Sequence, residues 1–171
     1  MQAADKKKIY LSSPTMNGHE MDYIQEAFDS NWIAPLGKNV DEFEKEIASY
    51  IGVSHAAALS AGTAALHLAV KLAGITKGDI VFSSSLTFAA TCNPVVYEHG
   101  KLVFIDSEKD TWNMSPEALE EGFKKYPNAK AVILAHLYGT PAKLDEIISI
   151  CDKYGAVLIE DAAEALGSSY K

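Results

Sequence analysis

The chain has 171 residues, of which 48% are hydrophobic and 22% are charged, and its formal net charge at pH 7 is -8. This composition is typical of a globular protein with one sizeable core. The acidic balance argues against binding to nucleic acid or to an anionic membrane surface, and no apolar run approaches the roughly 18 residues that a membrane-spanning helix needs.

The N-terminal sequence and the cysteines bear on location. The opening residues, MQAADKKKIYLSSP, contain lysines but no apolar segment after them, so no signal peptide is expected. Cys92 and Cys151 lie far apart in segments with helical patterning, and no Cys or His spacing typical of a metal site is present. We therefore expect buried free thiols, no metal and a cytoplasmic protein.

The first third of the chain is predicted to be mainly helical. Four apolar residues recur at the spacing of one helix face: Met21, Ile24, Ala27 and Phe28. They predict a helix over 18–30 with one buried stripe, after a short extended piece at 9–14. A second amphipathic helix is expected over 40–51, ended by Gly52. The apolar loop 31–37 between them is expected to line a pocket, to form a subunit contact or to be packed under other residues.

From residue 56 onward, short apolar segments alternate with amphipathic ones. The expected strands are 56–60, 79–82, 102–105, 131–135 and 157–159. The expected helices are 64–73, 88–98, 115–125 and 141–154. Repeated strand–helix units with crossovers of this length predict an α/β fold, with a mostly parallel sheet flanked by helices, in a single domain.

Ligands of open parallel sheets bind beyond the carboxyl ends of the strands. This rule selects five segments on one edge of the expected sheet: 60–63, 83–88, Asp106, 136–139 and 161–164. In the last of these, the apolar run 156–159 leads directly into Glu160 and Asp161. Because a buried charge is costly unless it is paired, Asp161 is expected to face a cationic partner; the alternative is an Asp that only caps the next turn.

Other positions on this edge are also candidates for ligand contacts. Gly62 and Thr63 lie at a helix start, where free N–H groups and a hydroxyl suit a phosphate, although a tight turn explains the same residues. Phe88 begins a helix, where it could stack on a flat ring or belong to the core. His136 follows a strand and is either a ligand contact or a structural histidine with satisfied hydrogen bonds.

Five motifs occur along the chain: SAGTAALHLAV at 60–70, SLTFAA at 85–90, FID at 104–106, LYG at 137–139 and IEDAAEALG at 159–167. In this order they resemble the sugar aminotransferases of the DegT family, which depend on pyridoxal 5'-phosphate (PLP), and the resemblance covers essentially the whole chain. The loop NWIAPLG at 31–37 is similar to the branch that aminates 4-keto-6-deoxy UDP-amino sugars in exopolysaccharide and glycan synthesis.

The resemblance implies part of the large domain of a fold type I PLP-dependent transferase. Gly62 and Thr63 would hold the cofactor phosphate, and Phe88 would stack on the pyridine ring. Asp161 is the implied catalytic residue, because it would keep the ring nitrogen protonated and so make the ring an electron sink. Glu164 stands where the family has a polar side chain near the phenolic oxygen; an ionised Glu there would need a shared proton or a different orientation.

The family's Schiff-base lysine lies beyond the Asp motif, and Lys171 falls too early to be that lysine. Residues 1–171 are therefore expected to be the N-terminal part of the PLP-binding large domain, inactive alone, without the lysine segment and the small C-terminal domain. For the full-length protein the resemblance implies a homodimer that transfers an amino group from an amino-acid donor such as glutamate to a keto sugar nucleotide.

Other readings of the sequence stay open. A PLP-dependent sugar dehydratase would use the same pocket with a His in place of the lysine. A non-catalytic fragment would act through assembly or PLP binding. A nucleotide-dependent dehydrogenase on a Rossmann sheet would need the GxGxxG fingerprint, which the chain lacks.

Overall fold

The computed structural model describes residues 8–10 and 13–171. By its contacts the chain divides into two compact units, 1–58 and 59–171, each of which is described by itself. The single domain expected from the sequence stays a prediction. The extended piece expected at 9–14 lies partly outside the described residues, since Leu11 and Ser12 are not among them.

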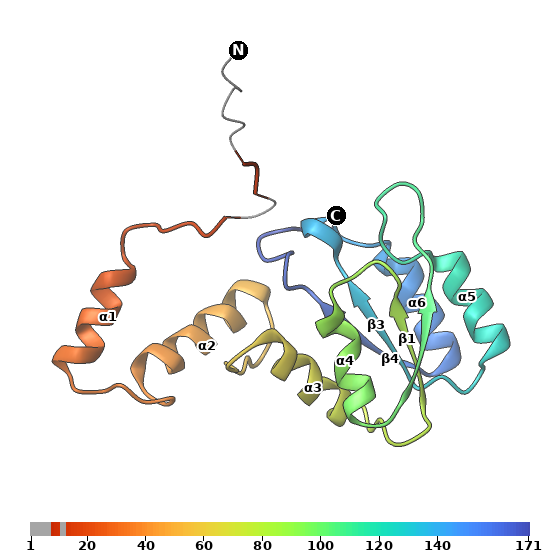
Figure 1. Cartoon of the computed structure of the whole chain (residues 1–171), viewed down its shortest axis with the longest axis horizontal. Helices are drawn as coiled ribbons and strands as arrows, with labels where there is room; N and C mark the ends of the chain where they lie inside the picture. The colour runs from red at the N-terminus through yellow and green to blue at the C-terminus, as the bar shows by residue number, and fades with distance from the viewer. Residues whose placement is uncertain (1–7, 11–12) are drawn as a thin grey trace, which may run out of the picture. The chain divides into compact units, whose positions relative to one another are not determined.

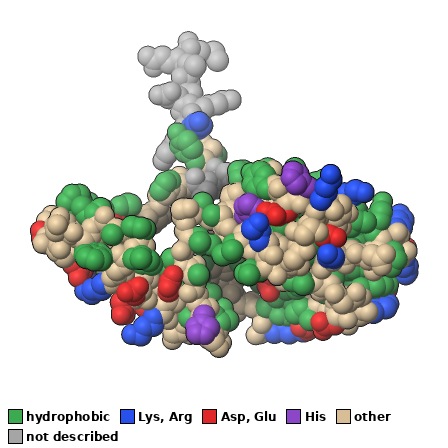
Figure 2. Space-filling model, turned by 90° about the horizontal axis from the view of Figure 1, so that it is seen from below, with side chains coloured by type: hydrophobic (Ala, Val, Ile, Leu, Met, Phe, Trp, Pro, Cys, Tyr) green, Lys and Arg blue, Asp and Glu red, His purple; other side chains and the backbone are tan. Residues whose placement is uncertain are grey.

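The first unit contains two helices, α1 (Glu20–Asp29) and α2 (Lys38–Ile51). Both were expected, and α2 ends as predicted at Gly52, which adopts a left-handed conformation. The expected burial of the α1 stripe is wrong: none of the residues of α1, all of which are described, is buried. Two helices enclose too little volume to cover this stripe, and hydrophobic side chains, green in Figure 2, remain on the surface.

The strand expected over 56–60 is also wrong, because this segment is irregular. Its N–H groups find no neighbouring strand; instead, the N–H of Ala58 donates to Oε1 of Glu44 at 2.7 Å. Alanine has a low propensity for strands, and three consecutive alanines give an apolar run without the bulk that packs on a pleated surface.

The second unit is built on a four-stranded parallel sheet in the order β2-β1-β3-β4 (Figure 1). The strands are β1 (Ile80–Ser84), β2 (Lys101–Ile105), β3 (Ala131–Ala135) and β4 (Val157–Asp161). The helices are α3 (Gly62–Leu72), α4 (Ala89–Tyr97), α5 (Pro116–Lys125) and α6 (Leu144–Tyr154), and a short 3₁₀ turn covers Leu137–Gly139. The predicted α/β fold with a parallel sheet flanked by helices is confirmed.

Two hydrophobic clusters fill the two sides of this sheet. One joins side chains of α3 and α4 to the sheet: Leu66, Val70, Ile75, Val81, Val95, Ala131, Ile133 and Ile159. The other joins side chains of α5 and α6 to the opposite face, around Phe82, Leu119, Phe123, Val132, Leu134 and Ile147. Alternate residues of β1, β3 and β4 therefore enter opposite clusters, as the period of two along a strand requires.

Local signals explain several boundaries. Helix α5 begins as predicted, because the Ser115 hydroxyl accepts the N–H of Ala118 at 3.1 Å and Pro116 occupies the first turn. Helix α6 begins at Leu144, three residues later than expected, and the N–H of Ala142 before it donates to the ring of His136. Both cysteines are free, but only Cys151 is buried, whereas Cys92, also expected to be buried, is half-buried. Burial raises the pKa of Cys151 to about 11.

Candidate active site

The carboxyl ends of the four parallel strands meet along one edge of the sheet. The register of β3 and β4 sets Ala135 beside Asp161, and that of β1 and β2 sets Ser84 beside Ile105. The predicted convergence of the segments after these strands on one edge is thus confirmed for β1 to β4. The edge carries the polar side chains from which a site can be built.

Strand alternation separates the two neighbouring acids of β4. Ile159 belongs to the cluster under α3 and α4, whereas Leu158 packs against the cluster under α5 and α6. Two residues further along, Asp161 lies on the same face as Ile159, and Glu160 lies on the face of Leu158. Asp161 therefore shares its side of the sheet with helices α3 and α4.

The carboxylate of Asp161 is held by two donors. The hydroxyl of Thr91, in the first turn of α4, donates to Oδ2 at 2.6 Å, and the N–H of Ala163 reaches Oδ1 at 3.3 Å. The second bond is the turn cap that was the alternative explanation of this Asp, so Asp161 caps the turn and also contacts α4. Sequence reasoning missed Thr91, because a threonine in a helix carries no signal of a partner 70 residues away.

Phe88 is the N-cap residue of α4 and its side chain is 81% exposed, which excludes a place in the core. Its carbonyl accepts the N–H of Thr91 at 3.0 Å. The same turn of α4 thus carries an exposed aromatic ring and the hydroxyl that contacts Asp161. An exposed aromatic side chain at this edge is available to stack on a flat ligand.

Helix α3 starts at Gly62, two residues earlier than predicted. The first N–H groups that bond within this turn are those of Ala64 and Ala65, both to the carbonyl of Ala61. Within the described part of the chain, the N–H groups of Gly62 and Thr63 have no acceptor. A Cβ added at Gly62 would meet no atom within 4 Å, so the space before the helix is open.

Glu164 is engaged with the 3₁₀ turn that follows β3. Its Oε2 accepts the N–H of Tyr138 at 2.6 Å, and Tyr138 has a left-handed backbone with φ of 50°. Gly139, with φ of 81°, passes so close that an added Cβ would lie 2.9 Å from the carbonyl oxygen of Glu164. The carboxylate of Glu164 therefore supports a loop on the edge of the sheet.

His136 has the structural role that was the alternative to ligand binding. The ring is buried, its Nδ1 accepts the N–H of Ala142 at 3.2 Å, and its Nε2 lies 2.9 Å from Oε2 of Glu160. Because Nδ1 accepts, Nε2 carries the proton and donates to the carboxylate. This hydrogen bond holds the pKa of Glu160 below its ordinary value.

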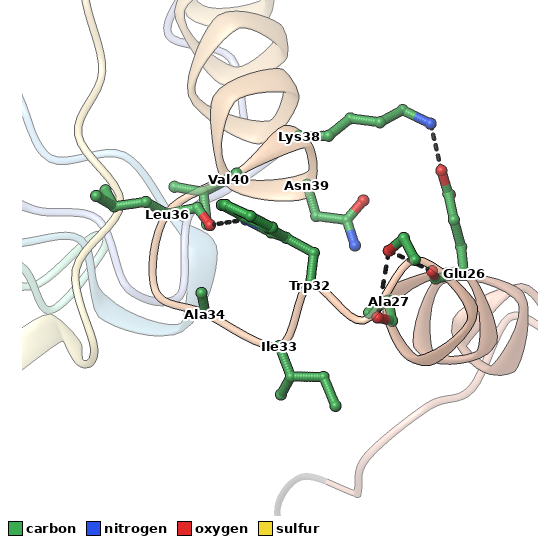
Figure 3. A pocket seen from close by; sticks show the side chains of 11 residues that line it. Glu26, Ala27, Trp32, Ile33, Ala34, Leu36, Lys38, Asn39 and Val40 are labelled. Atoms are coloured by element: carbon green, nitrogen blue, oxygen red, sulfur yellow. Dashed lines mark hydrogen bonds and ion pairs between the residues drawn. The ribbon is translucent and has the colours of Figure 1, made fainter.

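The apolar loop 31–37 in the first unit lines a cavity of about 510 Å³ (Figure 3). Trp32, Ile33 and Leu36 remain exposed, so the loop is not packed under other residues. The indole Nε1 of Trp32 donates to the carbonyl of Leu36 at 2.5 Å, and Lys38 pairs with Glu26 across the rim. A side chain at Gly37 would overlap the indole, which explains the glycine.

Two classes of feature are missing from the described residues. Across 8–10 and 13–171, no helix combines the length and the apolarity that a bilayer crossing requires. In the same residues, no three His, Cys, Asp or Glu side chains gather as a metal ion would require.

Known proteins are similar to this chain over most of its length. The family model of the DegT/DnrJ/EryC1/StrS aminotransferases matches residues 14–171. EpsN of Bacillus subtilis (strain 168), provisionally named a pyridoxal phosphate-dependent aminotransferase, is 57% identical over 169 residues, which are 96% of this chain and 44% of EpsN. GDP-perosamine synthase of Caulobacter vibrioides is 39% identical over 168 residues, 98% of this chain and 45% of that protein.

The fold agrees with these similarities. The crystal structure of the aminotransferase from Psychrobacter cryohalolentis superposes with a TM-score of 0.84 at 30% identity, over 92% of this chain and 40% of that one. The chain therefore spans less than half the length of the relatives it matches. With a family model that matches 158 of its residues, from 14 to 171, the chain belongs to the DegT/DnrJ/EryC1/StrS aminotransferase family.

Proposed function

We propose that the protein is a PLP-dependent aminotransferase that passes an amino group from glutamate to a keto sugar nucleotide in polysaccharide biosynthesis. In this proposal residues 1–171 form the N-terminal part of the PLP-binding large domain, and a lysine from a further segment completes the site. The observation that carries it is the carboxylate of Asp161, held by Thr91 on the face of the sheet that α3 and α4 cover.

The residues present on this edge fit the cofactor. The open space before Gly62, with free N–H groups at the start of α3, suits a phosphate group. The exposed ring of Phe88 suits the face of a pyridine, and the carboxylate of Asp161 suits a protonated ring nitrogen. In this proposal the phosphate, the ring face and the ring nitrogen of the cofactor would each have a matching group in the chain: backbone N–H groups, an aromatic ring and a carboxylate.

Each residue has a distinct task in this proposal. PLP, when bound, supplies an electron sink for the carbon that exchanges its amino group. Asp161 keeps the proton on the ring nitrogen, because an adjacent negative charge favours the cationic form. Thr63 and Gly62 bind the phosphate, and Phe88 orients the ring. Glu164 supports the loop beside the site, because its Oε2 accepts the N–H of Tyr138. In this proposal its other carboxylate oxygen contacts the cofactor.

The names of the relatives support the class of substrate. GDP-perosamine synthase is named for a sugar nucleotide, and another relative, which is 37% identical over 160 residues, is named for spore coat polysaccharide biosynthesis. We infer a nucleotide-linked 4-keto sugar as the acceptor, with the 4-keto-6-deoxy UDP-amino sugars as the first candidates. A homodimer in the cytoplasm completes the proposal.

The test uses the full-length protein with glutamate and a panel of 4-keto-6-deoxy sugar nucleotides, followed by mass spectrometry of the products. We expect an aminated sugar nucleotide and one 2-oxoglutarate for each. Asp161→Asn should lower the rate by more than about tenfold, the equivalent of one lost hydrogen bond to a charged group. The matched control is Glu160→Gln, which changes the neighbouring acid on the other face of the sheet and should leave the rate within about twofold.

Two outcomes would overturn the proposal. An unchanged rate in Asp161→Asn would remove the role given to this carboxylate. A deoxygenated product without a new nitrogen would show that the protein is a sugar dehydratase, the alternative that uses the same pocket. Dynamic light scattering or ultracentrifugation of the same sample tests the dimer.

A further inference from the structure

Two threonines, Thr87 just before α4 and Thr91 in its first turn, form a chain of hydroxyl groups that ends at Asp161. The Oγ1 atoms of Thr87 and Thr91 are 2.7 Å apart, and Oγ1 of Thr91 is 2.6 Å from Oδ2 of Asp161. Thr91 is 0% exposed. Its hydroxyl therefore has these two protein partners and no access to solvent.

The hydrogen bonds in this chain are all donated in one direction, toward Asp161. An ionised carboxylate only accepts hydrogen bonds, and a threonine hydroxyl has a single proton to donate. Thr91 must therefore donate to Asp161, and it must accept from Thr87. Each hydroxyl is polarised by the next, and the negative charge on Asp161 stabilises the whole arrangement.

The bond from Thr91 also sets the spacing between two parts of the proposed site. Helix α4 follows β1, whereas Asp161 ends β4, and β3 lies between these strands in the sheet. Thr91 lies in the same turn as Phe88, whose carbonyl accepts its N–H. A single hydroxyl thus connects the turn that carries the exposed aromatic ring to the carboxylate on the far side of β3.

The other oxygen of Asp161 is held less firmly. Its donor is the N–H of Ala163 at 3.3 Å, which belongs to the turn after β4. Without the hydroxyl of Thr91, the carboxylate would keep only this longer bond and could rotate about its side-chain torsions. The orientation of the carboxylate therefore depends mainly on Thr91.

We propose that Thr91 is a positioning residue, which aims the carboxylate of Asp161 at the ring nitrogen of the cofactor, and that Thr87 fixes the direction of its hydroxyl. This inference rests on the proposed function, because it takes the ring nitrogen as the partner of Asp161. It assigns no contact between Thr91 and the cofactor. Its consequence is selective: loss of the hydroxyl should affect only ligands that have the ring nitrogen.

The test measures binding by isothermal titration calorimetry in the full-length protein, with two probes. One is pyridoxamine 5'-phosphate, which binds without a covalent bond to lysine; the other is its carbocyclic analogue, in which C–H replaces the ring nitrogen. Thr91→Val, which preserves shape and removes the hydroxyl, should weaken the first probe about tenfold and leave the second unchanged. Thr91→Ser restores a hydroxyl and should restore the preference for the nitrogen-containing probe.

The matched control is Thr76→Val. Thr76 also donates its hydroxyl to an aspartate, Asp79, at 2.8 Å, but this pair precedes β1 at the amino end of the sheet. Its loss should leave the binding of both probes unchanged. If Thr91→Val does not fold, Thr87→Val is measured instead. Its loss of binding affinity should be smaller and should again affect only pyridoxamine 5'-phosphate.

The outcomes separate this inference from the proposed function. A wild-type protein that binds both probes equally would contradict the role of Asp161 and hence the proposed function. A wild-type protein that prefers the nitrogen-containing probe, with a Thr91→Val variant that keeps this preference, would overturn only the role of Thr91. Equal weakening of both probes in Thr91→Val would reduce Thr91 to a purely structural residue and would also overturn the inference.

Discussion

Replacing Asn113 by alanine should lower the free energy of unfolding of the protein by about 2 kcal/mol. Asn113 lies in the loop between β2 and α5 and is only 2% exposed. Its Oδ1 accepts the N–H of Leu137 at 2.8 Å, and its Nδ2 donates to the carbonyl of Thr140 at 2.9 Å. One side chain therefore holds both ends of the turn after β3.

The magnitude follows from the burial of the two partners. Leu137 is half-buried, so its N–H loses its acceptor where water reaches it poorly, at a cost of about 1–3 kcal/mol. Thr140 is exposed, so its carbonyl can bind water instead and should add little to the loss. The sum is dominated by the N–H of the half-buried Leu137, which gives the value of about 2 kcal/mol.

Asn113→Asp provides a sharper version of the same prediction. The carboxylate keeps an acceptor for Leu137 but turns an oxygen toward the carbonyl of Thr140, so the folded pKa of the new acid should rise above its unfolded value of about 3.9. A raised folded pKa means that the protonated acid is favoured in the folded state. The destabilisation should therefore be largest at neutral pH and should shrink as the pH falls through the folded pKa.

Urea denaturation of wild type, Asn113→Ala and Asn113→Asp at pH 7 and at pH 4 measures these values, and hydrogen exchange of the Leu137 amide reports the local opening. A loss below about 0.5 kcal/mol in Asn113→Ala would refute the reasoning, since it is the size expected of an ordinary surface substitution. An Asn113→Asp variant whose loss is the same at both pH values would refute the assignment of the Thr140 contact.

Three other predictions test separate parts of the fold. Phe123→Ala should cost about 3–5 kcal/mol in urea denaturation, because its ring is fully buried; a loss under 1 kcal/mol would contradict this. The pKa of Glu108 is lowered to about 2, mainly by the hydroxyl of Thr111. Its stabilising effect is therefore present above its ordinary pKa of 4.5 and is lost as the pH falls toward 2. Glu108→Gln should therefore reduce the slope of the free energy of unfolding against pH between these values. An unchanged slope would contradict the prediction. Gly139→Ala should lower the Tm more than Gly155→Ala, since both have positive φ but only the former adds a clash; equal losses would show that backbone strain alone decides.

Much of the second unit could be predicted because its signals are local. Each strand from β1 to β4 is a short apolar run, and glycines in left-handed conformations follow helices α3 and α6 at Gly74 and Gly155. The start of α5 follows from Ser115 and Pro116 in the same way. These features depend on residues within a few positions of one another, so the linear sequence contains them.

The errors arose where the outcome depends on distant partners. The segment 56–60 has the composition of a buried strand, yet it forms none because no neighbouring strand completes its hydrogen bonds. The stripe on α1 has the right period, but the period does not say whether another element covers it. Burial and sheet pairing are properties of the assembled chain, which a local pattern does not specify.

In the candidate site, too, residues marked by local signals could be predicted and those that depend on distant partners could not. The rule for parallel sheets selected Asp161 and Phe88 because it needs only the order of the strands and helices. It selected Gly62 through the strand expected at 56–60, which does not form. Thr91 could not be selected, since its hydroxyl acquires a partner only when α4 lies across the sheet from the end of β4. A search for hydroxyl residues one helical turn after a loop at the carboxyl edge would have been the nearest available signal.

The opposite orientation of Glu160 and Asp161 has an evolutionary consequence. Although they are adjacent in the sequence, the two acids lie on opposite faces of the sheet and contact different partners, Thr91 and His136, so each can be replaced without loss of the other's contact. Insertion or deletion of a single residue within β4 would be far more damaging than either replacement. Such a shift would turn Glu160 toward the face that α4 covers and so remove its carboxylate from His136.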